Sequence, residues 1–302
     1  MAREMSLPPG TDIGFSEAPP RVNEFRRFLK VFLGRPVVVM GSLVILLVLV
    51  CAVVPQWLAP YSPTYQNLKA ILETPSAAHW LGTDALGRDL FSRIIFGART
   101  ALIIASCAIG LATVTGTLLG LMAGYFRGWT YVIIMRFIDT LMAFPGMLLT
   151  LTIAALLGGG IKMVIIALGV TAIPQYARIM CGQTMSIREN DYIMAEQALG
   201  ASSPRIMFKH LLPNAFPPMI VLMTIAIGFT ILAEAGLSYL GIGITEPTIA
   251  WGSLVNSGNA YLMNRPLLAM APGAAIMLVV FAFNMVGDGL RDALDPRLRG
   301  TL

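Results

Sequence analysis

Long uninterrupted runs of apolar side chains constrain this sequence more than any other feature. The first run, residues 37–54, reads VVVMGSLVILLVLVCAVV, close to the ~20 residues that a helix needs to cross ~30 Å of hydrocarbon. Only 12% of the residues are charged, about half the proportion found in soluble domains. The sequence therefore predicts an all-α membrane protein with six transmembrane helices, at residues 37–57, 99–122, 131–157, 163–182, 217–240 and 267–287.

The first span is expected to anchor the chain, because its apolar core exceeds the 7–15 residues of a cleaved signal peptide. The tail before it, residues 1–36, ends in the sequence VNEFRRFLKVF. In that stretch Phe25, Phe28, Leu29 and Phe32 recur at helical spacing opposite basic residues. This pattern predicts a short amphipathic helix that lies on membrane lipid at the inner surface; a solvated basic lead-in is the alternative.

The distribution of Lys and Arg predicts the orientation of the chain. If the N-terminus is cytoplasmic, 15 of the 21 Lys and Arg residues lie on the inner side of the membrane, which is the usual determinant of orientation. Both termini, including a tail at residues 291–302, and the segment 183–216 are then cytoplasmic. Residues 58–98 form an extracytoplasmic loop that leads into a core of five spans at residues 99–290. The net charge of +5 reflects this bias and does not indicate a nucleic-acid partner.

Two acidic residues inside the predicted spans are candidates for a solute pathway. Asp139 follows Arg136 by three residues, so the two side chains can pair on one helix face. Glu234 lies near the outer end of the fifth span, where it could bond to a neighbouring helix or to interfacial water. Each unpaired charge costs roughly 2.5–3.5 kcal/mol at the bilayer centre, so such acids are functional candidates. A structural role and a place in the pathway both stay open for each.

Glycines and prolines predict how the spans pack and bend. Gly116, Gly120 and Gly124 repeat at intervals of four residues, a spacing that lets two helices approach closely. Pro145, followed by glycine, predicts a kink in the middle of the third span. Asp89 is predicted to begin the helix that continues into the second span.

The segment 191–216, DYIMAEQALGASSPRIMFKHLLPNAF, is polar and helix-like although apolar spans flank it. Asp191 can cap a first helix, Gly200 can end it in the left-handed conformation, and Ser203 with Pro204 can begin a second one.

The first of these helices is too short to persist alone in water. Ala195, Ala198 and Leu199 lie on or near one of its faces, so we expect it to sit in a groove of a partner protein. A connector packed on the chain's own cytoplasmic surface is the alternative that the residues leave open.

The same segment resembles the coupling motif of binding-protein-dependent ABC importer permeases, Glu-Ala-Ala-x3-Gly-x9-Ile-x-Leu-Pro. When the two are aligned on Gly200, the first Ala and the closing Leu-Pro match, whereas Met194, Glu196 and His210 depart from the motif. The sequence HLLPN at 210–214 is typical of the dipeptide/oligopeptide/nickel branch of that family. Three further segments resemble the same branch: HWLGTDALGRDLFSR at 79–93, GLSYLGIGITEPTIAWG at 236–252 and NMVGDGLRDALDPRLRG at 284–300.

This resemblance implies a type I ABC importer permease of the MetI-like fold in a prokaryotic plasma membrane. It implies three kinds of partner: a homologous second permease, two ABC ATPase subunits and an extracytoplasmic solute-binding protein. Residues 191–203 would form the coupling helix that docks on an ATPase. The residues expected to couple to the ATPase are Ala195, Glu196, Ala198, Leu199, Gly200, Ala201, Ser202 and Pro213.

The chain itself is expected to be non-catalytic and to hold no cofactor. It lacks the Gly-x4-Gly-Lys-Ser/Thr order of a phosphate-binding loop, so ATP and Mg would bind to the partner subunits. Peptides are the solutes that the resemblance favours, with nickel, glutathione or oligosaccharides as alternatives.

Two other classes of protein fit less well. An ion-coupled secondary carrier would need inverted repeats or titratable groups at the membrane midplane, and only Asp139 and Glu234 come near that requirement. An intramembrane hydrolase would need a placed base, but His79 and His210 are predicted on opposite sides of the membrane. No metal site is expected, because the three cysteines have no metal-ligand spacing.

Overall fold

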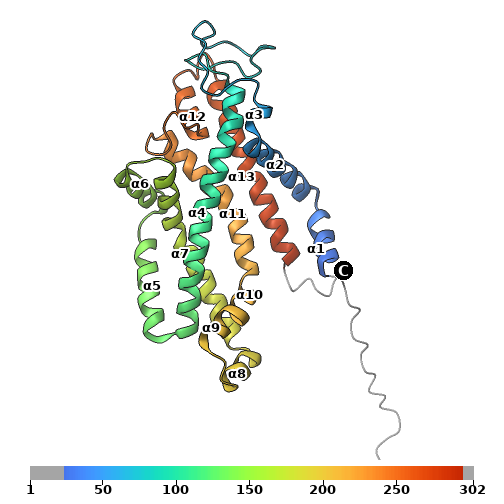
Figure 1. The fold of residues 1–302 in the computed structure, drawn as a ribbon, viewed down its shortest axis with the longest axis vertical. Helices are drawn as coiled ribbons and strands as arrows, with labels where there is room; N and C mark the ends of the chain where they lie inside the picture. Colours follow the sequence, from blue (N-terminus) through green and yellow to red (C-terminus); the bar gives the residue numbers. More distant parts are fainter. Residues whose placement is uncertain (1–23, 295–302) are drawn as a thin grey trace, which may run out of the picture.

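The computed structural model describes residues 24–294, and in this range every regular element is helical apart from one isolated bridge between Thr83 and Asp89. Figure 1 shows the long helices side by side, with α8 at one end and the loop that follows α3 at the other. The elements are α1 (Glu24–Leu33), α2 (Pro36–Val53), α3 (Pro55–Leu58), α4 (Leu90–Phe126), α5 (Gly128–Met142), α6 (Gly146–Leu157), α7 (Ile161–Arg188), α8 (Asp191–Ala198), α9 (Ser203–Arg205), the π-helix η1 (Ile206–Leu211), α10 (Leu212–Ala215), α11 (Pro217–Tyr239), α12 (Trp251–Asn259) and α13 (Leu267–Leu294).

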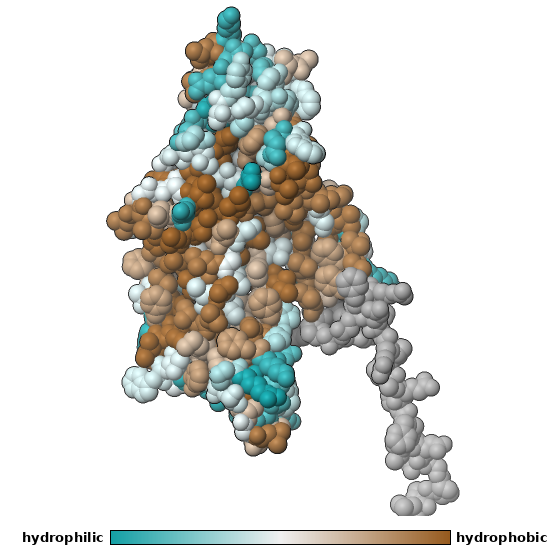
Figure 2. Space-filling model, in the orientation of Figure 1, coloured by the Kyte–Doolittle hydropathy of each residue, from teal (hydrophilic) through white to brown (hydrophobic). Residues whose placement is uncertain are grey.

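Five helices, α2, α4, α7, α11 and α13, are long and apolar enough to cross a membrane, and the number rises to six if α5 and α6 count as one span. Figure 2 shows a broad apolar belt between more polar ends. The side chains that α2 exposes, among them Leu43 and Leu47, are aliphatic, as contact with lipid requires. The predicted all-α fold and its spans are therefore confirmed, with the third span as the exception.

The third predicted span, 131–157, is not one kinked helix. It consists of α5 and α6, which meet at an angle of 89°. Pro145 occupies the N-cap position of α6 with φ −56° and ψ 123°. Because proline has no N–H to donate and also disfavours helical geometry in the residue before it, α5 ends and a new helix begins. The predicted position of the bend is confirmed. The bend is larger than a kink, because it separates two helices.

The glycines of the second span bring α4 against α7, and these two helices make the most extensive helix–helix contact within residues 24–294. A Cβ added to Gly116 would lie 2.5 Å from the Cβ of Tyr176. A Cβ added to Gly120 would lie 2.3 Å from the backbone oxygen of Ala177. The backbones thus approach more closely than any side chain at these positions would permit, as the glycine spacing predicts.

The end of the molecule opposite α8, which the sequence predicts to be extracytoplasmic, is formed by the cap, defined here as residues 59–89, together with α12. Asp89 accepts a hydrogen bond from the backbone N–H of Ser92 at 2.8 Å and so begins α4, as predicted. The helix α12 was not predicted from the sequence. Its Trp251 packs on Gly97 and donates from Nε1 to the carbonyl oxygen of Ile94 at 2.9 Å, which fastens α12 to the outer turns of α4.

The predicted tail at residues 1–36 is described only from α1 onward, and the tail at 291–302 only as far as residue 294. The expected helix is present as α1, where the rings of Phe28 and Phe32 stack with centroids 5.6 Å apart. Arg35 forms an ion pair with Asp292 near the end of α13. The first and last described helices therefore meet in the half of the molecule that also contains α8 (Figure 1). Contact of α1 with lipid stays a prediction.

A substitution at Gly120 tests whether the α4–α7 contact holds the bundle together. Gly120→Leu should destabilise the purified protein by roughly 1–3 kcal/mol, because an overpacked contact must open. The control is Gly110→Leu on the same helix, where an added Cβ meets no atom within 4 Å. The measurement is the fraction of monodisperse protein left after heating in detergent. Equal heat resistance of the two variants would contradict the assigned role of Gly120.

Candidate functional site

The end of the molecule opposite the cap carries a helical hairpin, named here the inner hairpin and defined by residues 191–215. It consists of α8, a turn in which Gly200 has φ +81°, and the continuous helical segment α9–η1–α10. A left-handed φ of this kind is the usual helix-ending conformation of glycine. The predicted order of short helix, tight turn and second helical segment is therefore confirmed.

The helix starts differ from the prediction by one residue each. Asn190, not Asp191, occupies the N-cap position of α8, and its side chain makes no capping hydrogen bond. Ser202, not Ser203, precedes α9. The second segment also continues through Pro213 to Ala215, and the π-helix η1 ends two residues before this proline.

One side of the inner hairpin is fixed to the bundle by apolar burial. Ile193, Ile206 and Leu211 are fully buried in one cluster with Tyr176 and Met180 of α7. Burying side chains of this size contributes about 1.5–3 kcal/mol each. The hairpin is thereby held as part of the bundle, so a displacement of it must move the helices that it contacts.

The opposite side of the inner hairpin is open. Ala195 and Ala198 are exposed on the side of α8 away from Ile193, and Leu199 at the tip is 86% exposed. The predicted common face of these residues is confirmed. Small side chains beside one exposed leucine suit close approach to a partner surface. Among the other predicted coupling residues, Gly200, Ser202 and Pro213 are exposed, whereas Glu196 and Ala201 are partly buried.

Glu196 faces the second half of the hairpin. Its carboxylate oxygen lies 3.6 Å from Nε2 of His210, and 31% of its side chain is exposed. Asn214 donates at 2.7 Å to the carbonyl oxygen of His210, which holds that residue in place. Two residues that depart from the family motif thus lie next to each other.

The helix α11 connects the inner hairpin to the end of the bundle that carries the cap. It begins directly after α10, with Phe216 alone between them. Near its outer end, Glu234 is 1% exposed and accepts a hydrogen bond from the Ser238 hydroxyl at 2.7 Å. The same hydroxyl oxygen accepts from the backbone N–H of Ile244 at 2.9 Å. The observed bond of Glu234 therefore lies within α11, not to a neighbouring helix, and it supports the loop that follows. A bond to interfacial water stays a prediction.

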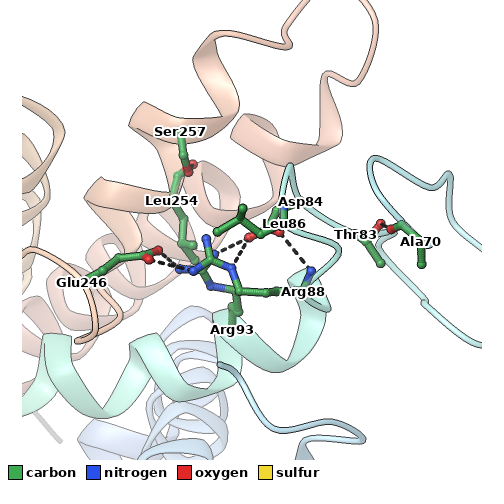
Figure 3. A network of polar contacts seen from close by, with 9 residues as sticks. All are labelled: Ala70, Thr83, Asp84, Leu86, Arg88, Arg93, Glu246, Leu254 and Ser257. Atoms are coloured by element: carbon green, nitrogen blue, oxygen red, sulfur yellow. Dashed lines mark hydrogen bonds and ion pairs between the residues drawn. The ribbon is translucent and has the colours of Figure 1, made fainter. Parts of the chain in front are cut away.

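That loop is fastened to the cap by a closed ring of four charges, here called the outer ring (Figure 3). Arg88 donates to Asp84 from Nε and to Glu246 from Nη1, both at 2.7 Å. Arg93, in the first turn of α4, donates to Glu246 from Nη2 at 2.7 Å and also bonds to Asp84. Each guanidinium thus joins both carboxylates, a geometry that the fixed fork of arginine favours.

Three of the four ring residues are buried, whereas 51% of the Glu246 side chain is exposed. The hydrogen bond from Arg88 lowers the pKa of the Glu246 carboxyl, and the bond from Arg93 lowers it further. Together they outweigh partial burial, which raises it, so the pKa lies below its usual range. Burial alone would lower the pKa of Arg88, but its bonds to Glu246 and Asp84 outweigh burial, and that pKa is raised. Glu246 and Arg88 are therefore charged over the physiological range.

The sequence analysis did not predict the outer ring, although two residues indicated it. Arg88 and Arg93 lie on the side of the membrane that is predicted to be extracytoplasmic, where few basic residues occur. Asp84 is close to both arginines in the sequence. Glu246 is more than 150 positions away, so the sequence does not predict that it lies beside them. Only the packing of α12 on α4 brings the two parts together.

Asp139 forms an ion pair, but with a different partner from the predicted one. Its Oδ1 accepts from Nη2 of Arg178 on α7 at 2.7 Å, and both side chains are about half exposed, at 50% and 55%. Arg136, which lies on the same helix as Asp139, is exposed. The predicted Arg136–Asp139 pair is therefore wrong, because the close approach of α5 to α7 gives Asp139 a cation on the neighbouring helix.

The bundle, the anchored inner hairpin and the outer ring together define a multi-pass membrane protein of the transporter type. The family described as the binding-protein-dependent transport system inner membrane component matches residues 116–300. The N-terminal TM domain of oligopeptide transport permease C matches residues 23–75. The chain belongs to the family of binding-protein-dependent transport system inner membrane components, which are permease subunits that act with a binding protein and ATPase subunits.

Similar proteins agree with this assignment. The glutathione transport system permease protein GsiD of Pectobacterium atrosepticum is 41% identical over 276 residues, covering 91% of this chain and 92% of that protein. The dipeptide transport system permease protein DppC of Alkalihalophilus pseudofirmus is 38% identical over 278 residues, covering 92% and 91%. An inward-facing structure of the MetNI methionine ABC transporter matches with a TM-score of 0.57 at 19% identity, covering 68% of this chain and 98% of that one. The MetI-like fold expected from the sequence is thus confirmed.

Removing one charge tests the outer ring. Glu246→Gln should lower the melting temperature of the protein, because the two guanidiniums then share a single carboxylate. The folded-state pKa of Glu246 lies below its unfolded value, so its stabilising effect is complete above the unfolded value, about 4.3. It is lost only as the pH falls through the lowered folded-state pKa. The melting-temperature gap to wild type should therefore stay constant from about pH 8 to pH 5.5 and close in stronger acid.

The matched control is Glu73→Gln, which alters an exposed carboxylate of the same cap. It should leave the melting temperature unchanged throughout. An equal effect of both substitutions would indicate a general charge effect and would contradict the outer ring as a specific fastening.

Proposed function

We propose that this chain forms one half of the translocation pathway of an ATP-driven importer, paired with a homologous second permease. Two ATPase subunits bind on the side of the inner hairpin, which is cytoplasmic together with both termini, and a solute-binding protein delivers solute at the cap. ATP and Mg bind to the ATPase subunits, and this chain is non-catalytic and holds no cofactor. The observation that carries the proposal is the inner hairpin, anchored on one face and open on the other.

The inner hairpin transmits the motion of the ATPase. Its open face, with Ala195, Ala198 and Leu199, docks in a cleft of one ATPase subunit. When ATP closes the ATPase dimer, the hairpin moves with the cleft that holds it. The buried contacts of Ile193 and Leu211 pass this motion to α7, and the continuous connection passes it to α11. Such a transition needs rigid elements with two packing arrangements.

Small peptides and peptide-like molecules are the proposed solutes. Glutathione and dipeptide permeases are among the proteins to which the chain is similar over nine-tenths of its length, and both names describe short peptide-like molecules. Nickel and oligosaccharides remain as alternatives within the same transporter branch. Asp139 is a pathway residue in this proposal, while Glu234 is buried in the present conformation and would reach a pathway only if α11 moved.

A charge at the tip of the inner hairpin should uncouple the transporter. Leu199→Asp places a carboxylate on a side chain that is 86% exposed, so the chain should fold normally while docking is lost. Gly200→Pro should act similarly, because proline cannot adopt a φ of +81°. We expect at least a tenfold loss of ATP-driven solute uptake in proteoliposomes that contain the complete transporter.

Met263→Asp is the control, since Met263 is equally open but lies between α12 and α13 at the other end. It should retain the ATPase subunits during purification, whereas Leu199→Asp should lose them. Full uptake by Leu199→Asp would refute docking of the hairpin tip.

A second measurement tests whether Glu196 contacts an ATPase subunit. A Glu196→Cys variant should react with a thiol reagent in the isolated chain, because part of the side chain is exposed. In the assembled transporter the reaction should slow at least tenfold. Unchanged labelling after assembly would mean that Glu196 serves the hairpin alone through its contact with His210.

A further inference from the structure

The inner half of α7 has an exposed polar face, named here the α7 stripe. It consists of Gln175, Arg178, Gly182 and Ser186 together with Glu189, the C-cap residue of α7, and all five are exposed. Their spacing of three, four, four and three residues places them on one side of an α-helix. None of them has an apolar side chain, although α7 is one of the helices that can span a membrane.

The same face of α7 is covered farther toward its outer end. Leu168 is buried there, and the Thr171 hydroxyl is hydrogen-bonded to that of Thr150 on α6 at 3.0 Å. The turn of 89° between α5 and α6 places α6 over this outer part only. The inner part of the face is consequently left open in the chain.

Other exposed faces of the bundle are of a different kind. On α4 the exposed large side chains include Ile103, Val114 and Leu118, and on α13 they include Met277 and Leu278. These aliphatic faces suit the hydrocarbon of a bilayer. A row of polar groups does not, because hydrocarbon offers them no hydrogen-bond partners.

The ion pair beside the stripe supports the same conclusion. Asp139 and Arg178 are joined at 2.7 Å while about half of each side chain is exposed. Arg136 is also exposed on α5, so three charged groups lie open on adjoining surfaces. Charged groups at such positions in membrane proteins face a water-filled cavity or the interior of an assembly.

The stripe reaches well into the span. The glycine contacts set its level, because Gly120 packs on Ala177 and Gly124 packs on Thr184. With 28 residues, α7 is about 42 Å long and exceeds the ~30 Å of hydrocarbon. Ser186 and Glu189 at its inner end can therefore reach the cytoplasm, while Gln175 lies within the span. The stripe leads from the aqueous side into the membrane.

We propose that the α7 stripe, together with Asp139 and Arg136, forms the wall of a water-filled vestibule that the transported solute contacts on its way to the cytoplasm. This inference rests on the proposed importer function and identifies the solute-contacting surface of the chain. The wall offers two neutral ion pairs, Arg178 with Asp139 and Glu189 with Arg127, together with the guanidinium of Arg136 and uncharged amide and hydroxyl groups. Such a surface suits a hydrophilic solute with both ammonium and carboxylate groups. It offers groups of both charges to the solute, and it binds each of them weakly because most wall charges are already paired.

Thiol accessibility in the assembled transporter tests the proposal. In a background with Cys51, Cys107 and Cys181 replaced by alanine, Gly182→Cys introduces a thiol where an added Cβ meets no atom within 4 Å. The control is Met122→Cys on the exposed face of α4, at the same level, since the neighbours Gly120 and Gly124 pack beside Gly182. The probe is the positively charged 2-(trimethylammonium)ethyl methanethiosulfonate, applied to transporter in nanodiscs.

We expect Gly182→Cys to react at least tenfold faster than Met122→Cys. The reaction should slow at least fivefold with ATP and orthovanadate, when the pathway turns outward. Equal rates at the two positions would overturn the proposal in favour of a lipid-facing stripe. Rapid but state-independent labelling would assign the stripe to the headgroup region. Reaction in the isolated chain that is blocked in every state of the complex would assign it to the second permease.

ATP-driven uptake by the same preparations separates this proposal from the importer function. Active uptake with an unreactive Gly182→Cys would refute the vestibule alone. Absence of uptake even with unsubstituted protein would instead refute the proposed function. As a second variant, Ser186→Cys repeats the labelling one turn farther inward, in case a substitution at Gly182 disturbs assembly.

Discussion

The close contact of α4 with α7 is the interaction on which the rest of the structure depends. Gly116, Gly120 and Gly124 leave three positions on one face of α4 without side chains, so the backbone of α7 can lie against it there. Outside water, helix association relies on this kind of close packing more than on the hydrophobic effect. Because one face of α7 packs against α4, the polar face of α7 points away from α4. The contact thus decides the orientation of the α7 stripe and supplies Tyr176 and Met180, on which the inner hairpin is anchored.

A second consequence concerns α11, which has a fixed attachment at each end. Its inner end continues into the hairpin, and its outer end leads to the loop in which Glu246 is bound by Arg88 and Arg93. A helix of 23 residues is about 35 Å long, so it links the two sides of the membrane directly. Three ring residues are buried and one is half exposed. Glu246 is therefore the member of the outer ring that is already in contact with solvent.

The sequence predicted what local rules control. Apolar length gave the spans, glycine spacing gave the α4–α7 contact, and Gly200 gave the turn of the inner hairpin. It could not predict features that need the relative placement of distant segments, such as the partner of Asp139 or the attachment of Glu246 to the cap. The turn of 89° after α5 lies between these cases. Proline predicts that a helix stops there, but packing of the following helix against α7 and α11 decides its new direction.

The helix α5 marks one border of the proposed pathway. Only Met135 and Ile138 of its 15 residues are buried, so α5 contacts the bundle along a narrow strip. One exposed sector carries Ile133 and Phe137, while the adjoining sector carries the charged Arg136 and Asp139. An apolar sector next to a charged one means that two different environments meet along this helix. The charged sector continues across to the α7 stripe through the pair with Arg178, so α5 forms the border of the proposed vestibule, and the wall on its far side must come from another subunit.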